Sequence, residues 1–170
     1  MNMHNPNIVR EHLEPRALRD VLGCFATGVA VVTTCDTDAV PVGMTINSFA
    51  SVSLDPPEIL WSIASNASSR NAFVNHGAFA INIMSAQDKD RTLQFARPAE
   101  DKFRGVDWRP GWRGVPVLSL AMATLECELK QCIPSGDHEI VIGSVKAIDR
   151  RSGDPLIFYR GEFSELGSTL

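Results

Sequence analysis

The stretch from Gly43 to Pro57 alternates apolar and polar positions with a period of two. One face is mostly apolar and comprises Met44, Ile46, Ser48, Ala50, Val52 and Leu54. The other face carries hydroxyls, one carboxamide and one aromatic ring, from Thr45, Asn47, Phe49, Ser51 and Ser53. This alternation predicts a β-strand with one buried face. The polar face has no charge, which suits a bound group that needs many neutral hydrogen bonds, such as a phosphate, a ribityl chain or a ring carbonyl. A strand of small residues packed under another layer fits the pattern about equally well.

Elsewhere the pattern predicts several strands separated by turns, with helices only as short inserts. Strands are expected at 29–35, 58–64, 79–84, 121–133, 138–148 and 156–163. Short helices are expected around 70–76 and 85–96, with a long ordered loop at 97–114. This succession predicts an antiparallel barrel. An earlier helix is expected to begin at Pro15, with its apolar stripe forming a lid on the barrel: Leu18, Val21, Leu22 and Phe25.

The length of 170 residues predicts a single domain, with residues 1–14 as a flexible arm. The net charge of −4 gives no reason to expect binding to nucleic acid or to an anionic membrane. No apolar run is long enough to cross a bilayer, and the first 15 residues lack the apolar segment of a secretory signal. A cytoplasmic location is therefore expected.

The four cysteines predict free thiols, because none of them form a C-x-x-C pair. Cys127 and Cys132 have opposite parity, so in one regular strand they are expected to face opposite ways. Their spacing with His138 matches no standard zinc pattern, and no metal site is expected.

The tripeptide Gly136-Asp137-His138 lies between two long predicted strands. Asp137 is expected to orient the imidazole through the turn backbone or by direct contact. A turn aspartate followed by a surface histidine is the plainer interpretation. No dinucleotide fingerprint, phosphate-binding P-loop or serine nucleophile elbow occurs in the chain, so a nucleotide must be held in another way.

Several segments together resemble the short-chain flavin reductases, the reductase components of two-component flavin monooxygenases. Residues 43–49 (Gly-Met-Thr-Ile-Asn-Ser-Phe) and 51–57 (Ser-Val-Ser-Leu-Asp-Pro-Pro) are similar to the family's flavin-binding segment. The other matching pieces are Phe25–Thr33, Asp101–Trp108, Gly136–His138 and Tyr159–Gly161, so the resemblance covers most of the chain.

The resemblance implies a mainly β fold, a six-stranded antiparallel split β-barrel of the FMN-binding type with short flanking helices. It implies a homodimer that transfers a hydride from NAD(P)H to FAD or FMN and passes reduced flavin to a separate monooxygenase that acts on an aromatic compound. NADH is the expected donor, and FAD is slightly favoured over FMN. The alternative is a flavin- or haem-binding protein of the same fold without reductase turnover.

The resemblance also implies a set of site residues. His138 is the expected catalytic residue, acting beside the nicotinamide and flavin rings. Lys102 is expected to place positive charge near a phosphate or the reduced ring. The full flavin-binding set is Thr45, Ile46, Asn47, Ser48, Ser51, Val52, Ser53, Ala64, Ser68, Ser69, Lys102, Phe103, Asp137, His138 and Tyr159.

Overall fold

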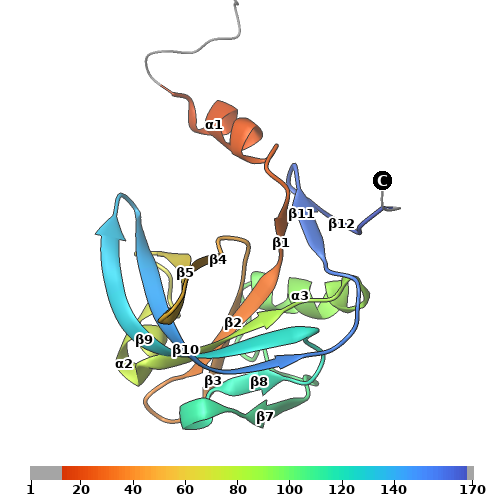
Figure 1. The fold of residues 1–170 in the computed structure, drawn as a ribbon. Helices are drawn as coiled ribbons and strands as arrows, with labels where there is room; N and C mark the ends of the chain where they lie inside the picture. The colour runs from red at the N-terminus through yellow and green to blue at the C-terminus, as the bar shows by residue number, and fades with distance from the viewer. Residues whose placement is uncertain (1–12, 168–170) are drawn as a thin grey trace, which may run out of the picture.

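Seven antiparallel strands form one curved sheet in the computed structural model, which describes residues 13–167 (Figure 1). The strands lie in the order β3-β2-β6-β9-β10-β5-β4. Their bounds are β2 (Ala30–Cys35), β3 (Pro41–Ile46), β4 (Ala50–Leu54), β5 (Pro57–Ala64), β6 (Ala78–Ile83), β9 (Ala123–Ser135) and β10 (His138–Arg150). The predicted mainly β fold is confirmed, although the sheet has seven strands where six were expected.

Helices and short strands flank this sheet. The helices are α1 (Pro15–Leu22), α2 (Arg70–His76), η1 (Ala86–Asp88), α3 (Lys89–Ala96) and η2 (Trp112–Gly114). Two small sheets pair β7 (Trp108–Pro110) with β8 (Pro116–Leu118), and β1 (Thr27–Gly28) with β11 (Ile157–Tyr159) and β12 (Glu162–Ser164). The single final strand predicted at 156–163 is therefore a hairpin, because Arg160 and Gly161 both have positive φ and turn the chain back.

The barrel interior is an apolar core built around Trp61. Its indole packs edge-on against Phe73 at 5.0 Å and against Phe79 at 5.7 Å between ring centroids. Phe73 belongs to α2, so this helix closes one end of the barrel. Ile46 on β3 and Phe49, the residue before β4, both pack against this core. β3 and β4 are the two end strands of the sheet and are not paired with each other. This gap between the end strands makes the barrel a split one.

The predicted continuous strand from Gly43 to Leu54 is wrong, because the chain turns a corner after Ile46. β3 and β4 are separate and lie at opposite ends of the sheet. At the corner the Ser48 hydroxyl accepts from the N–H of Ser62 at 3.0 Å and donates to its C=O at 3.2 Å, fixing the corner against β5. A register shift within β4 then leaves Leu54 93% exposed, so the expected buried face does not continue.

The expectation that Cys127 and Cys132 face opposite ways is also wrong. Both pack on the barrel core. The pairing of β9 with β10 shifts register between Ile142 and Gly143, and the extra residue on β9 reverses the parity of the later residues of that strand.

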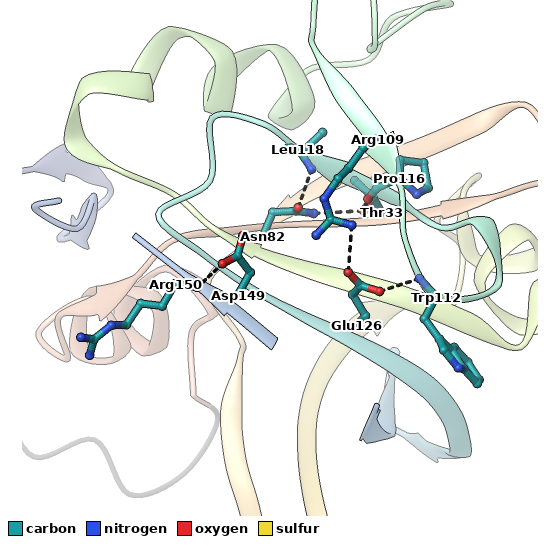
Figure 2. Close-up of polar contacts among 9 residues, drawn as sticks. All are labelled: Thr33, Asn82, Arg109, Trp112, Pro116, Leu118, Glu126, Asp149 and Arg150. Carbon is teal, nitrogen blue, oxygen red and sulfur yellow. Dashed lines mark hydrogen bonds and ion pairs between the residues drawn. The ribbon is translucent and has the colours of Figure 1, made fainter. Parts of the chain in front are cut away.

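The segment from 97 to 118 covers the outer face of the sheet instead of forming an open loop. Its anchor is Asn82, which is fully buried (Figure 2). The Asn82 amide donates to the Thr33 hydroxyl at 3.0 Å and accepts from the N–H of Leu118 at 2.9 Å. The Thr33 hydroxyl in turn donates to the C=O of Pro116. These bonds tie β8 to β2 and β6.

A buried ion pair fixes the other strand of this covering hairpin. Glu126 on β9 accepts from Arg109 at 3.3 Å with one carboxylate oxygen and from the N–H of Trp112 at 2.5 Å with the other (Figure 2). Figure 2 shows all three side by side on the outer face. Both oxygens of this carboxylate are thus satisfied within the fold.

The interpretation of the first helix as a lid is wrong. Figure 1 shows α1 standing away from the barrel. Its apolar face is exposed, with relative exposures between 43% for Leu18 and 78% for Phe25, and it includes Val21 and Leu22. Within residues 13–167, no helix has the length and apolar character needed to cross a membrane.

Candidate active site

β3 is the last strand of the sheet, so one side of its backbone has no partner strand. Gly43 lies in the middle of this strand, where α3 crosses closely. A Cβ on Gly43 would lie 2.8 Å from two carbons of the Phe95 ring. The glycine therefore lets α3 approach β3, and polar groups gather at the two ends of the strand.

The first pocket, of about 390 Å³, lies at the beginning of β3. Ser68, Ser69 and Lys102, three of the residues expected to bind flavin, line it together. The remaining lining residues are Asp36, Thr37, Pro41, Val42, Gly43, Asn71, Ala72, Asn75, Ala99 and Glu100.

The charge balance in this pocket depends on Lys102. Its ammonium donates to the C=O of Phe95 at 2.9 Å, and burial lowers its pKa from the ordinary 10.5. Two carboxylates, Asp36 and Glu100, share the pocket. Asp36 is already engaged, because it accepts from the N–H groups of Asp38 and Val40 in the preceding turn.

Ser69 is positioned by contact with β3 and not by capping its own helix. Its side chain makes no capping bond at the start of α2. Its hydroxyl instead donates to the Met44 sulfur at 3.5 Å. This contact holds the start of α2 beside β3 and leaves the lone pairs of the hydroxyl free to accept.

The second pocket, of about 220 Å³, lies at the other end of β3. Thr45, Ile46 and Asn47 line it, and the Thr45 hydroxyl donates to the C=O of Thr92 at 2.6 Å. The opposite walls are apolar and come from Val29, Ala96, Phe158 and Phe163. A flat ring with polar edges suits walls of this kind.

The β9–β10 turn carries the Asp137–His138 pair. Imidazole Nδ1 lies 2.7 Å from an Asp137 carboxylate oxygen, so direct contact is the way in which the aspartate orients the ring. The hydrogen bond to His138 holds the pKa of Asp137 below its ordinary value. Gly136 has a φ of +62°, a turn conformation that favours glycine.

Strand register brings this turn close to the corner after β3. His138 pairs with Ala64 across β10 and β5, and the N–H of Ser65 donates to the C=O of Asp137 at 2.9 Å. Ser48 is anchored on Ser62, two residues before Ala64 and about 7 Å along the strand. Ala64, Asp137 and His138 thus lie next to one another, two residues along β5 from the contact that anchors the corner, and they line neither of the two pockets.

Other predicted site residues line neither of these two pockets. Ser51, Val52 and Ser53 are on β4, at the opposite end of the sheet order. Phe103 packs edge-on against Phe95 at 5.1 Å, on the α3 side of β3. Tyr159 is 40% exposed, with the Arg160 guanidinium over its ring at 5.2 Å.

Phe158 is the site residue that sequence reasoning missed. It lines the 220 Å³ pocket together with Thr45 and Asn47, and it also lines a further pocket of about 290 Å³ beside α1. Neighbouring strand residues face opposite ways, so Phe158 lines these pockets, whereas Tyr159, which the family resemblance implied, lines neither of them. The available signal for Phe158 was the alternation of residues along β11, together with the glycine-containing turns on either side of this strand.

Comparison with known proteins decides the family. The flavin reductase-like domain model matches residues 22–167. This chain is a member of the flavin reductase-like family. The predicted family and split-barrel fold are therefore confirmed.

Two curated relatives of this flavin reductase-like chain carry functional names. It is 43% identical to the FMN reductase (NADH) of Agrobacterium fabrum, over 87% of this chain and 84% of that protein. It is also 43% identical to the reductase component of a flavin-dependent trigonelline monooxygenase of Acinetobacter baylyi, over 87% of this chain and 48% of that protein. The chain spans only about half the length of some curated relatives that it matches.

A solved structure extends the likeness to the whole barrel. The NADH:FAD oxidoreductase of Streptomyces globisporus, in complex with NAD and FAD fragments, superposes with a TM-score of 0.85 at 34% identity. The superposition covers 93% of this chain and 98% of that chain.

Proposed function

We propose that this protein is an NADH-dependent flavin reductase that reduces FAD or FMN. The observation that carries the proposal is the arrangement of the residues expected to bind flavin, which cluster at the two ends of β3 and at the adjacent Asp137–His138 turn, in a chain of this family. The family members named above as an FMN reductase (NADH) and an NADH:FAD oxidoreductase support the same reaction.

The donor set fits a flavin. The pocket at the start of β3 offers a half-buried cation and two hydroxyls, from Lys102, Ser68 and Ser69, which suit a phosphate. The pocket at the end of β3 combines apolar walls with Thr45 and Asn47, which suits the isoalloxazine ring. From Val42 to Asn47 the chain advances by five residue steps, or about 16 Å, a distance that an extended ribityl phosphate chain and ring can occupy.

His138 acts on nicotinamide placement or on charge at the reduced ring. A bound flavin supplies the ring atom that accepts the hydride. Asp137 holds imidazole Nδ1, so Nε2 is left to face the nicotinamide carboxamide or the ring. The imidazole is about half exposed in the chain alone, which leaves it accessible to a ligand.

The active unit that we propose is a homodimer. The α1 apolar face, made of Leu18, Val21, Leu22 and Phe25, is exposed in the single chain and is continuous with pockets lined by Arg19, Gly23 and Phe158. A second copy can cover this surface and complete the walls of the ring pocket. Sedimentation of Val21→Glu/Phe25→Glu tests this step, because the variant should sediment as a monomer while the parent sediments as a dimer.

Delivery of reduced flavin to a separate monooxygenase completes the proposed function. Its support is the name of the Acinetobacter relative, a reductase component of a monooxygenase. The proposal implies transient handover, since the ring pocket lies at the surface beside α1 and not in the barrel core.

A steady-state assay of NADH oxidation tests the proposed activity against its rival, a flavin- or haem-binding protein without turnover. The assay is run with FAD, with FMN and without flavin, and then with NADPH. We expect oxidation of NADH that requires added or bound flavin. Flavin binding without any NADH oxidation would favour the rival.

A further inference from the structure

Glu139 is a buried carboxylate one residue after His138. Successive strand residues face opposite ways, so the imidazole lies outside the barrel and the Glu139 side chain lies inside, where it is only 9% exposed. Burial of a carboxylate is costly unless it is paired. The ladder of β10 with β5 and β9 already holds this strand on both sides, so the fold does not need a charge there to set the register.

The partner of this carboxylate comes from the flavin-binding side of the site. Arg70, the first residue of α2, donates from Nε to Glu139 Oε1 at 2.7 Å. Arg70 directly follows Ser68 and Ser69 in the phosphate pocket. One ion pair therefore joins the segment that carries the two hydroxyls to the strand that carries His138.

The pair is the side-chain part of a double connection. The backbone part is the hydrogen bond from the N–H of Ser65 to the C=O of Asp137. Between these two ties lies the segment 65–69, which belongs to no strand or helix. The Ser69–Met44 contact holds this segment to β3, and the two ties link it to the start of β10.

The carboxylate is only half satisfied. Glu139 Oε2 is fully buried and has no hydrogen-bond partner among the described residues. An ion pair selected for stability alone would be expected to use both oxygens, as Glu126 does on the neighbouring strand. This incomplete pairing points to a role in alignment.

We propose that Arg70 and Glu139 are positioning residues for flavin reduction. They fix the distance between the Ser68–Ser69 segment and the His138 turn, so that a flavin held by its phosphate presents its ring to the imidazole. The inference rests on the proposed function. Neither residue touches the reacting atoms, and each acts through the segment that it holds.

The test replaces the pair by apolar side chains of similar size, in Arg70→Met/Glu139→Leu. Such a replacement of a buried ion pair usually leaves stability intact, so it separates alignment from folding. Hydride transfer is followed as anaerobic bleaching of flavin by NADH. We expect the rate at saturating NADH to fall by about 10- to 100-fold, while the KM for NADH changes by less than about 2-fold. A rate equal to that of the parent protein would overturn the proposal.

Two further variants keep the test decisive. Glu139→Gln retains an acceptor for Arg70 and the side-chain shape, and we expect a loss of about 3-fold even if the double variant does not fold. Unchanged bleaching in Glu139→Gln with a misfolded double variant would overturn the proposal, because the pair would then serve folding alone. Arg109→Met/Glu126→Gln is the matched control: it alters a pair on the outer face whose carboxylate is equally buried, although its arginine is more exposed, and it should bleach at the parent rate.

The behaviour of the parent protein distinguishes failure of the proposed function from failure of the positioning role alone. If it fails to bleach flavin with NADH, the proposed function fails and this inference fails with it. If the parent bleaches flavin and the Arg70 and Glu139 variants match it, only the positioning role is lost.

Discussion

Glu126 and Glu139 are buried to nearly the same extent, with side-chain exposures of 8% and 9%, yet their surroundings differ. Glu126 lies on the outer face of the sheet, where the covering hairpin satisfies both of its oxygens. Glu139 lies at the turn that carries His138 and has one oxygen unpartnered among the described residues. The carboxylate under the hairpin is satisfied by the fold, whereas the carboxylate beside the His138 turn keeps one oxygen free for another partner.

The side-chain amides of Asn82 and Asn47 show the same contrast between groups satisfied by the fold and groups that line a pocket. Asn82 uses both ends of its carboxamide inside the fold, with Val31, Thr33 and Leu118. Asn47 lines two pockets at the corner after β3. We therefore divide these polar groups into a buried scaffold set, which includes Asn82, and a site set, which includes the exposed Asn47, and substitutions should separate the two.

The largest effect is expected on the scaffold side, from Asn82→Ala. The change leaves the N–H of Leu118 and the C=O of Val31 without partners in the interior. We expect the free energy of unfolding to fall by about 2–4 kcal/mol, measured by urea denaturation. Flavin affinity at a temperature where the variant is folded should stay unchanged. A variant of normal stability would mean that the hairpin is held by its apolar contacts alone.

Lys102→Met should give the largest loss on the site side. Removal of the cation should weaken flavin binding by about 1.5–3 kcal/mol, which fluorescence quenching of the flavin can measure. Riboflavin, which has no phosphate, is the control ligand and should bind both proteins alike. Equal losses for FMN and riboflavin would place Lys102 outside the phosphate site.

The pH dependence of flavin binding follows from the same lysine. Burial lowers the pKa of Lys102 from 10.5, so its charge is lost at a lower pH than for an exposed lysine. Flavin affinity should therefore fall as the pH rises through this lowered pKa, and Lys102→Arg should remove this fall. Without flavin the sign is reversed: the unfolded chain binds more protons there, so stability gains as the pH rises through the lowered pKa. A flat affinity profile in the parent protein would contradict the role of Lys102.

Asn47→Ala should have a smaller effect on binding. One lost neutral hydrogen bond should weaken flavin affinity by about 0.5–1.5 kcal/mol. Ser51→Ala, on the opposite end strand β4, sharpens the comparison, because both residues were predicted from one polar face that the structure divides. If neither change alters the affinity, the polar face serves packing only.

The smallest effect is expected for the reactivity of the cysteine thiols, which tests how tightly the core is packed. Burial, with a lesser contribution from Glu126, raises the pKa of Cys127 to about 12, whereas Cys24 is exposed. At pH 8 a thiol reagent should modify Cys24 quickly and Cys127 only after unfolding. Mass spectrometry of the modified peptides checks the order. Early modification of Cys127 would show that β9 opens in the folded protein.

The sequence was sufficient to predict most strands, because alternation and turn residues are local signals, whereas the site residues stay a prediction. The capping-box helix is an example: Ser85 accepts from the N–H of Gln87, and α3 ends at Ala96 as expected. The corner at Ser48 was missed, because the partner that fixes it, the backbone of Ser62, is distant in the sequence.

The remaining errors have the same kind of cause. A bulge on β9 reversed the parity of Cys132, and alternation cannot reveal where an extra residue is inserted. The Arg70–Glu139 pair joins residues 69 positions apart, which no local pattern specifies. The apolar face of α1 was predicted to pack on the barrel, because the sequence does not tell which surface covers an amphipathic helix. In the structure this face is exposed.

Anaerobic stopped-flow bleaching of flavin by NADH in His138→Ala tests the central claim most directly, since it isolates hydride transfer from flavin release. His76→Ala, at the last residue of α2, is the histidine control. The account predicts bleaching slowed by about 10- to 1000-fold in His138→Ala, or about 1.4–4 kcal/mol, with Tm and flavin affinity nearly unchanged and the control at the parent rate. Bleaching at the parent rate in His138→Ala would contradict the account and leave the Asp137–His138 turn as structure alone.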